Sequence, residues 1–137
     1  MLKENVTLLP FGTNKKGIHI DKNNLNVLKN SYYGEIDHPG SMEILLNNVS
    51  HNITNLYSDN FSLYGDVKIL DTHQGRMLRE LVKLDLVVFR PRLSIDNNGI
   101  VSIYTFDAIT KDKDIYYDKF KYRHKKLKKL WKIIKNI

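Results

Sequence analysis

A histidine that stands beside an acid and directly before a proline is the feature of this 137-residue sequence best suited to chemistry. Asp37, His38 and Pro39 end a short strand-like run that begins at Tyr33. Proline fixes its own φ and disfavours helix at the residue before it, so the spacing predicts that His38 stands at the end of a strand. A histidine held there is suited to act as a catalytic base, because the backbone sets the position of the ring. The alternative interpretation is a plain turn without a chemical role.

Composition limits the classes of protein to which the chain can belong. Its length suits one domain with a single core. The sequence has no Cys, which excludes a disulfide framework, thiol catalysis and Cys-ligated zinc, and fits an intracellular or particle-assembled protein. Met1–Pro10 lacks the basic start and apolar run of a secretory signal, so we expect a protein that is not secreted. No stretch approaches the roughly 20 apolar residues that span a bilayer.

Hydrophobic spacing predicts an α+β fold with mainly antiparallel strands. The clearest local features are a hairpin of Ser50–Ser58 with Phe61–Leu70 and a helix over His73–Lys83 that begins after Asp71 and Thr72. Asp96–Gly99 has the composition of a hairpin turn. Further strands are predicted at Val6–Pro10, 34–39, Ile44–Asn48, Leu84–Phe89 and Ile100–Ile109, and a short helix is predicted at Asn23–Asn30 after Asp21.

The net charge of +7 comes from the C-terminal end of the chain. Residues 1–118 hold 13 Lys and Arg against 15 Asp and Glu, whereas residues 119–137 hold nine Lys and Arg and no acid. Apolar residues recur every three or four positions after Tyr116, which predicts a cationic amphipathic helix. We therefore divide the chain into a body, residues 1–113, and a basic segment, residues 114–137.

The basic segment admits several interpretations. Its apolar stripe could pack on its own body, or on an acidic surface of another protein. Contacts with nucleic-acid phosphates or with a membrane surface are further alternatives. The residues proposed to bind a partner or nucleic acid are Lys121, Arg123, Lys125, Lys128, Lys129, Trp131, Lys132 and Lys135.

Five short motifs between residues 14 and 109 resemble, in order, those of the prohead proteases of tailed phages. This family of capsid maturation serine peptidases is similar in fold to the herpesvirus assemblins. The motifs are Asn14–Gly17, Gly34–Pro39, Asn48–Ile53, Gly65–Arg76 and Thr105–Ile109. The resemblance implies a mainly antiparallel, barrel-like core with a few helices.

The resemblance also assigns roles at the active site, and two positions depart from it. His38 matches the catalytic His of the family, and Arg92 matches an Arg that helps to hold the oxyanion. Arg90 stands where the family has its nucleophilic Ser, and Leu93 replaces the Gly that follows. A guanidinium is permanently protonated and offers only donors, so Arg90 cannot attack a carbonyl carbon. Ser94 lies more than about 10 Å further along an extended strand and is a poor substitute.

These observations predict a phage virion or assembly protein that is catalytically inactive, with His38, His51, Arg90 and Arg92 marking a degenerate site. His51 is predicted to be a structural hydrogen-bond partner, and His38 is predicted to face Arg90. Capsid, portal or scaffold proteins are the expected partners, packaged DNA is a further one, and the virion or host cytoplasm is the expected location. No cofactor or metal is expected. The alternatives are an active prohead serine endopeptidase and a nucleic-acid-binding protein that acts through its basic segment.

Overall fold

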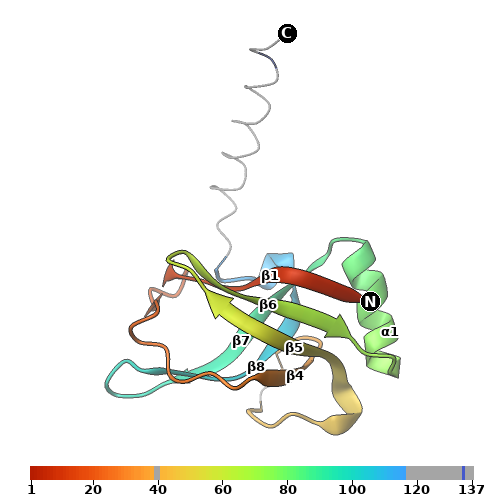
Figure 1. Ribbon diagram of the computed structural model, residues 1–137, viewed down its shortest axis with the longest axis horizontal. Helices are drawn as coiled ribbons and strands as arrows, with labels where there is room; N and C mark the ends of the chain where they lie inside the picture. Colours follow the sequence, from red (N-terminus) through yellow and green to blue (C-terminus); the bar gives the residue numbers. More distant parts are fainter. Residues whose placement is uncertain (39–40, 117–133, 135–137) are drawn as a thin grey trace.

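The computed structural model describes residues 1–38, 41–116 and 134, and four of the eight described strands form one antiparallel sheet (Figure 1). The strand order in this sheet is β1-β6-β5-β4. A second sheet pairs β7 with β8, and a third pairs the two-residue strands β2 and β3. The bounds are β1 Leu2–Pro10, β2 Gly12–Thr13, β3 His19–Ile20, β4 Ser31–Glu35, β5 Val49–Ser58, β6 Ser62–Ile69, β7 Val87–Ile95 and β8 Val101–Thr110.

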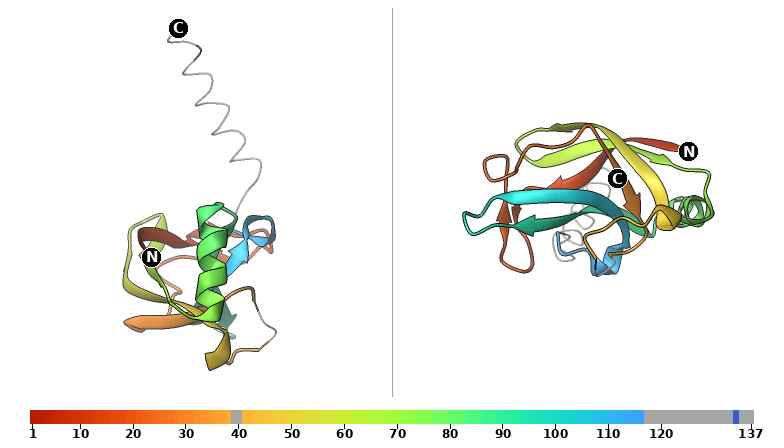
Figure 2. Two further views of the ribbon diagram at one scale, coloured as in Figure 1. Left: turned by 90° about the vertical axis from the view of Figure 1, so that its right-hand side faces the viewer. Right: turned by 90° about the horizontal axis from the view of Figure 1, so that it is seen from below.

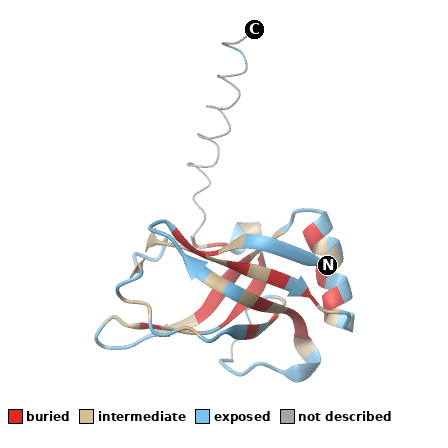
Figure 3. Cartoon of the chain, in the orientation of Figure 1, coloured by how far each residue is buried: buried red, intermediate tan, exposed pale blue. Residues whose placement is uncertain are grey.

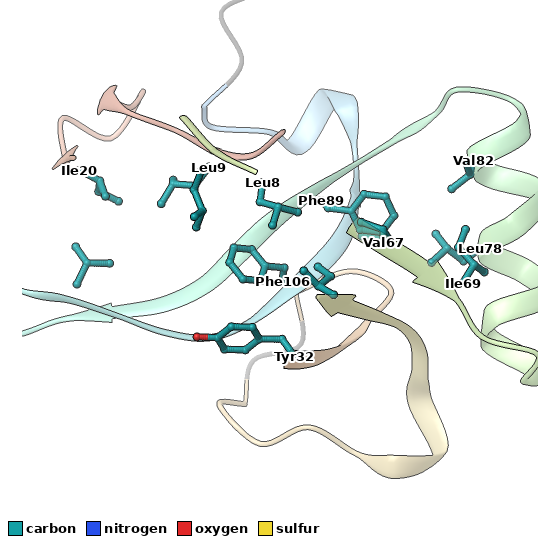
Figure 4. Packing of buried hydrophobic residues seen from close by; sticks show 14 residues of the cluster. Leu8, Leu9, Ile20, Tyr32, Val67, Ile69, Leu78, Val82, Phe89 and Phe106 are labelled. Atoms are coloured by element: carbon teal, nitrogen blue, oxygen red, sulfur yellow. The ribbon is translucent and has the colours of Figure 1, made fainter. Parts of the chain in front are cut away.

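The core lies between the four-stranded sheet and the β7–β8 pair, which form two layers in the view from below (Figure 2). Apolar side chains from both layers meet there, as the close view shows for Leu8, Phe89 and Phe106 (Figure 4). Along β6, Leu63, Gly65, Val67 and Ile69 are buried at alternating positions, and Figure 3 shows the distribution of burial over the chain. Full burial of one such side chain stabilises the fold by about 1.5–3 kcal/mol. This core is the support on which the β8 side chains near His38 are held.

The prediction of an α+β fold is confirmed, but the barrel-like closure is wrong. The described strands form separate sheets, and the backbone that follows β4 meets β8 through an isolated bridge between Ile36 and Ala108. No ladder joins β1 to β7 in the described part of the chain. The ring of backbone hydrogen bonds that defines a barrel is therefore open, and side-chain packing holds the two layers together.

The hairpin and the helix between residues 49 and 83 are confirmed. β5 and β6 pair antiparallel, with Ile53 opposite Val67. Helix α1 spans His73–Lys83, and the Thr72 side chain accepts a hydrogen bond from the Gly75 amide at its first turn. Leu78 and Val82 of α1 are buried at one end of the core. Both elements follow from local spacing and local capping, which explains why the sequence predicts them.

The helix predicted at residues 23–30 and the strand predicted at residues 44–48 are wrong. Their backbone amides and carbonyls form hydrogen bonds other than those of the predicted elements. Residues 23–30 form no helix: the Asp21 carboxylate accepts from the Asn23 and Asn24 amides, and the segment then pairs with Val101. The Val101 amide donates to Asn24 O at 2.7 Å and the Asn26 amide to Val101 O at 2.8 Å. The strand predicted at residues 44–48 is replaced by a 3-10 turn over Leu46–Asn48.

The predicted strand at residues 84–89 is displaced, because β7 begins at Val87 and runs through Pro91 to Ile95. Pro91 lacks an amide donor and is tolerated because β7 pairs on one side only, with β8. The turn at Asp96–Gly99 is confirmed, with the Gly99 amide donating to Asp96 O and Gly99 at φ 78°. β7 therefore carries Arg90 and Arg92 inside one continuous strand.

The proposed binding residues, from Lys121 to Lys135, lie outside the described residues, and of the basic segment only residues 114–116 and 134 are described, so the division at residue 114 stays a prediction. Within the described residues, no helix has the length and apolar character needed to cross a membrane.

Candidate functional site

His38 lies just beyond the end of β4, where the backbone turns toward β8. Ile36 forms a bridge with Ala108, and the Asp37 amide donates to the Ala108 carbonyl at 2.6 Å. Asp37 takes the left-handed conformation, with φ at 69°, which redirects the chain immediately before His38. The side chain of His38 keeps 40% of its surface exposed. The backbone thus presents an accessible imidazole beside the middle of β8.

The imidazole of His38 is paired with Asp107 of β8. His38 Nδ1 lies 2.8 Å from Asp107 Oδ2, and the Asp107 side chain is fully buried. An ionised carboxylate only accepts hydrogen bonds, so Nδ1 carries the proton of this pair and Nε2 of the neutral ring is the bare nitrogen. No described residue forms a hydrogen bond with Nε2. This geometry is that of a general base held by an acid.

Asp107 is kept ionised by the groups around it. Burial raises the pKa of this carboxyl, but hydrogen bonds from His38 and Arg92, the positive charge of Arg92 and the Glu35 amide together bring the pKa below its ordinary value. Arg92 Nε donates to Oδ2 at 2.9 Å, an Arg92 terminal nitrogen donates to Oδ1 at 2.8 Å, and the Glu35 amide donates to Oδ1 at 3.2 Å. A negative charge therefore stands directly behind the His38 ring.

Arg90 does not face His38, which corrects the sequence-based expectation. The guanidinium is buried against Asp114, with Nε 3.0 Å from Oδ1 and a second nitrogen 3.0 Å from Oδ2. It also donates to the carbonyls of Thr7 and Phe89, both at 2.9 Å. Asp114 thus pairs with Arg90, and Asp107 pairs with Arg92. His38 faces the carboxylate of Asp107 instead of a guanidinium.

His51 lies in the interior, away from the exposed face of His38. Its Nε2 donates to the Phe106 carbonyl at 2.7 Å, and its Nδ1 accepts from the Ser50 hydroxyl at 2.7 Å. The ring packs edge-on against Phe89, with centroids 5.0 Å apart. Burial lowers the pKa of His51 from 6.5 to about 4, despite the opposing influence of the Phe106 carbonyl and the Asp107 charge. His51 is therefore a neutral ring that bridges β5 and β8.

The low pKa of His51 predicts that the protein loses stability in mild acid. Unfolding returns the pKa to 6.5, so the unfolded chain binds the extra proton, and this contribution is complete above pH 6.5 and is lost as the pH falls to about 4. The loss amounts to about 3 kcal/mol of unfolding free energy. Urea unfolding at pH 7 and at pH 4.5 measures it. The unfolding free energy of His51→Gln should depend less steeply on pH than that of wild type. An equally steep dependence in this variant would mean that other groups cause the loss of stability in acid.

His38 borders a hollow of about 370 Å³ that can admit part of a substrate. Its walls come from the turn at residues 14–18, from β7 and from residues 113–116, which follow β8. Residues that line it include Lys16, Ile18, His38, Met42, Pro91, Leu93 and Tyr116. The hollow is mostly apolar, and His38 supplies a proton acceptor at its wall.

No described hydroxyl group is hydrogen-bonded to His38. The Ser94 hydroxyl instead lies 3.2 Å from the Tyr104 hydroxyl, in agreement with its distance from the site. Ser41 is the serine nearest to His38 in the sequence, and its hydroxyl accepts from the Glu43 amide at 3.0 Å. Groups of three or more His, Asp or Glu side chains able to hold a metal ion do not occur among the described residues.

The sequence-based prediction named His38 and Arg92 as positions of a degenerate site and omitted the acids that the structure places beside them. Asp107, Glu35 and Asp114 are all buried, and each is paired with an arginine. The available signal was the acid itself: Asp107 is flanked by the apolar residues Phe106, Ala108 and Ile109, and buried acids almost always have a partner. A carboxylate inside the Thr105–Ile109 motif could have been matched with His38 on this ground.

Comparison with known proteins gives a distant similarity to a solved structure. No family model and no curated protein matches the sequence. Among solved structures, the chain is similar to the capsid assembly protease gp21 of bacteriophage T4, with 16% sequence identity and a TM-score of 0.44. The match covers 57% of this chain and 56% of that chain, so this chain spans about half the length of the solved protein.

The prediction that the chain is catalytically inactive is corrected by this comparison. The solved structure reported above is that of a protease. The prediction depended on Arg90 taking the place of the nucleophile in front of His38. In the structure Arg90 is bound by Asp114, and the face of His38 that carries Nε2 is left without a described hydrogen-bond partner.

Proposed function

We propose that this chain is a hydrolase of the capsid assembly protease type that acts during the assembly of a phage particle. The observation that carries the proposal is the 2.8 Å hydrogen bond from His38 Nδ1 to the buried Asp107 carboxylate. It fixes the tautomer that leaves Nε2 free to accept a proton, at the wall of the hollow. The order of the His38 and Asp107 motifs in the sequence supports the same function.

The reaction is hydrolysis of a peptide bond. His38 Nε2 accepts the proton of a hydroxyl group while its oxygen attacks the carbonyl carbon of the substrate. The carbon–nitrogen bond then breaks, and the imidazolium returns the proton to the departing amine. Asp107 stays ionised and stabilises the imidazolium between these two transfers. Water and the Ser41 hydroxyl are the two candidate nucleophiles; with Ser41, an acyl-enzyme forms and a water molecule then hydrolyses it.

The test is hydrolysis of fluorophore-labelled denatured casein, and of capsid and scaffold proteins, by the full chain. Wild type should cleave them, and His38→Ala should lower the rate about 10²-fold or more because the proton acceptor is lost. His73→Ala, at an exposed histidine on α1, is the matched control and should keep the wild-type rate. A wild-type chain that cleaves none of these proteins would refute the proposal.

Labelling with a fluorophosphonate, together with the hydrolysis assay, identifies the nucleophile. After exposure to a fluorophosphonate, intact mass of the protein shows whether one adduct has formed. An adduct that is absent in Ser41→Ala and in His38→Ala assigns Ser41 as the nucleophile. Hydrolysis without an adduct, and retained in Ser41→Ala, assigns water activated by His38.

Particle proteins are the proposed substrates and partners, and the virion or the host cytoplasm is the proposed location. The basic segment, nine Lys and Arg without an acid in residues 119–137, supports attachment to an acidic protein or to DNA. Attachment to DNA predicts an affinity that falls steeply with salt concentration. Removing residues 119–137 should abolish this binding.

A further inference from the structure

Arg92 uses all of its hydrogen-bond donors on the protein itself. Its guanidinium has five N–H groups, and the structure gives it five acceptor contacts. Nε binds Asp107, one terminal nitrogen binds the carbonyls of Ser41 and Glu43 at 3.1 and 2.9 Å, and the other binds Glu35 and Asp107 at 3.1 and 2.8 Å. Only 4% of the side-chain surface is exposed.

This saturation is incompatible with the role that the family resemblance implies for Arg92. An oxyanion-stabilising donor must point at the position of the reacting oxygen and be free to bind it. Each N–H of Arg92 already has a protein acceptor, and two of those acceptors are buried carboxylates. Releasing one of them would leave an uncompensated charge in the interior, which strongly destabilises the fold.

The contacts of Arg92 instead converge on the surroundings of His38. The two nitrogens that hold Asp107 bind its two oxygens side by side, a fork arrangement that fixes the plane of the carboxylate. Oδ2 then lies where His38 Nδ1 meets it. The third nitrogen holds the backbone at Ser41 and Glu43, in the segment that follows the His38 turn.

We propose that Arg92 is a positioning residue, which sets the orientation of Asp107 and thereby the tautomer and direction of the His38 ring. This inference rests on the proposed function for its catalytic consequence, whereas its structural part holds for the folded protein alone. A lysine at position 92 keeps the charge but is a point donor that cannot bind both oxygens in a fork. The carboxylate of Asp107 would then rotate, and the His38 proton would be shared between Nδ1 and Nε2.

Nitrogen-15 spectra of His38 in Arg92→Lys test the inference, with Arg90→Lys as the matched control. Arg90 lies two residues away on β7 and is similarly buried. Its backbone stands opposite Asp107 in the β7–β8 ladder, but the hydrogen bonds and ion pair described for its side chain go to Asp114, Thr7 and Phe89. Wild type and Arg90→Lys should show one protonated and one bare ring nitrogen. In Arg92→Lys the two resonances should move toward each other. Equal spectra in all three proteins, or equal changes in the two variants, would overturn the inference.

Kinetics separate this inference from the proposed function. Arg92→Lys should lower kcat about 10²-fold with KM nearly unchanged, because the base is misplaced while substrate contacts remain. If wild type hydrolyses nothing, the proposed function fails, and the spectra still decide the role of Arg92.

If Arg92→Lys does not fold, the Nε–H resonance of Arg92 in the wild-type chain decides instead. It should be protected from exchange and should not shift when a peptide aldehyde is added. A shift would show that Arg92 contacts the ligand and would refute the positioning role.

Discussion

Asp107→Asn is expected to lower the rate of peptide hydrolysis about 10⁴-fold, the size of effect seen when an acid that orients a catalytic histidine is replaced by its amide. Arg92 donates to both oxygens of Asp107, so the single oxygen of the substituted side chain would take one of these bonds and its amide group would need an acceptor. His38 Nδ1 is the acceptor within reach. The ring would then carry its proton on Nε2, the atom that must accept a proton during catalysis.

The measurement is the initial rate of casein cleavage by folded Asp107→Asn, checked by circular dichroism and by urea unfolding. Asp85→Asn is a suitable control, because Asp85 is exposed and its positive φ of 56° is readily adopted by Asn. Asp85→Asn should cleave at the wild-type rate. A folded Asp107→Asn protein with a rate within about tenfold of wild type would remove Asp107 from the catalytic site.

Gly34→Ala is expected to prevent stable folding, because there is no space for a methyl group at this position. A Cβ there would overlap the Phe106 carbonyl oxygen and the Nε2 and Cε1 atoms of His51. The overlap falls on the hydrogen bond between these two residues, and one partner is strand backbone that cannot move aside. The cost should exceed the roughly 1–3 kcal/mol typical of overpacking and approach the whole stability of a small domain, about 5–15 kcal/mol.

Thermal and urea unfolding of Gly34→Ala measure this cost. Gly99→Ala provides a contrast, since no atom would lie near its Cβ and only its φ of 78° is unfavourable. The free energy of unfolding of Gly99→Ala should be about 1 kcal/mol lower than that of wild type. If Gly34→Ala had the same free energy of unfolding as wild type, β4 and β8 would have to lie further apart than the structure places them.

The parts of the fold that the sequence predicts correctly are those that short stretches determine alone. Helix α1 has its own N-cap at Thr72 and its own apolar stripe, and the β5–β6 hairpin has alternating residues on both strands. The helix expected at residues 23–30 fails for the opposite reason. Its backbone pairs with Val101, far away in the sequence, and a contact of that kind leaves no local pattern.

The site divides in the same way. The turn that presents His38 is encoded by neighbouring residues, whereas its partner Asp107 is 69 positions away. Two buried arginines stand two residues apart on β7, and nothing in their spacing says which of them meets Asp107 and which meets Asp114. The assignment depends on how β8 and the residues after it pack against β7. This long-range pairing is what the sequence-based expectation of an arginine in front of His38 could not include.

The buried pair of Arg90 and Asp114 anchors the backbone that follows β8 to β7. A force applied beyond residue 116 is transmitted at Asp114, through two contacts of 3.0 Å, to the guanidinium of Arg90 on β7. The same guanidinium holds the Thr7 carbonyl of β1, so the load is shared between the two layers. β7 also carries Arg92 two residues further on. Tension at the C-terminal end would therefore be borne by the strand that supports Asp107 and His38.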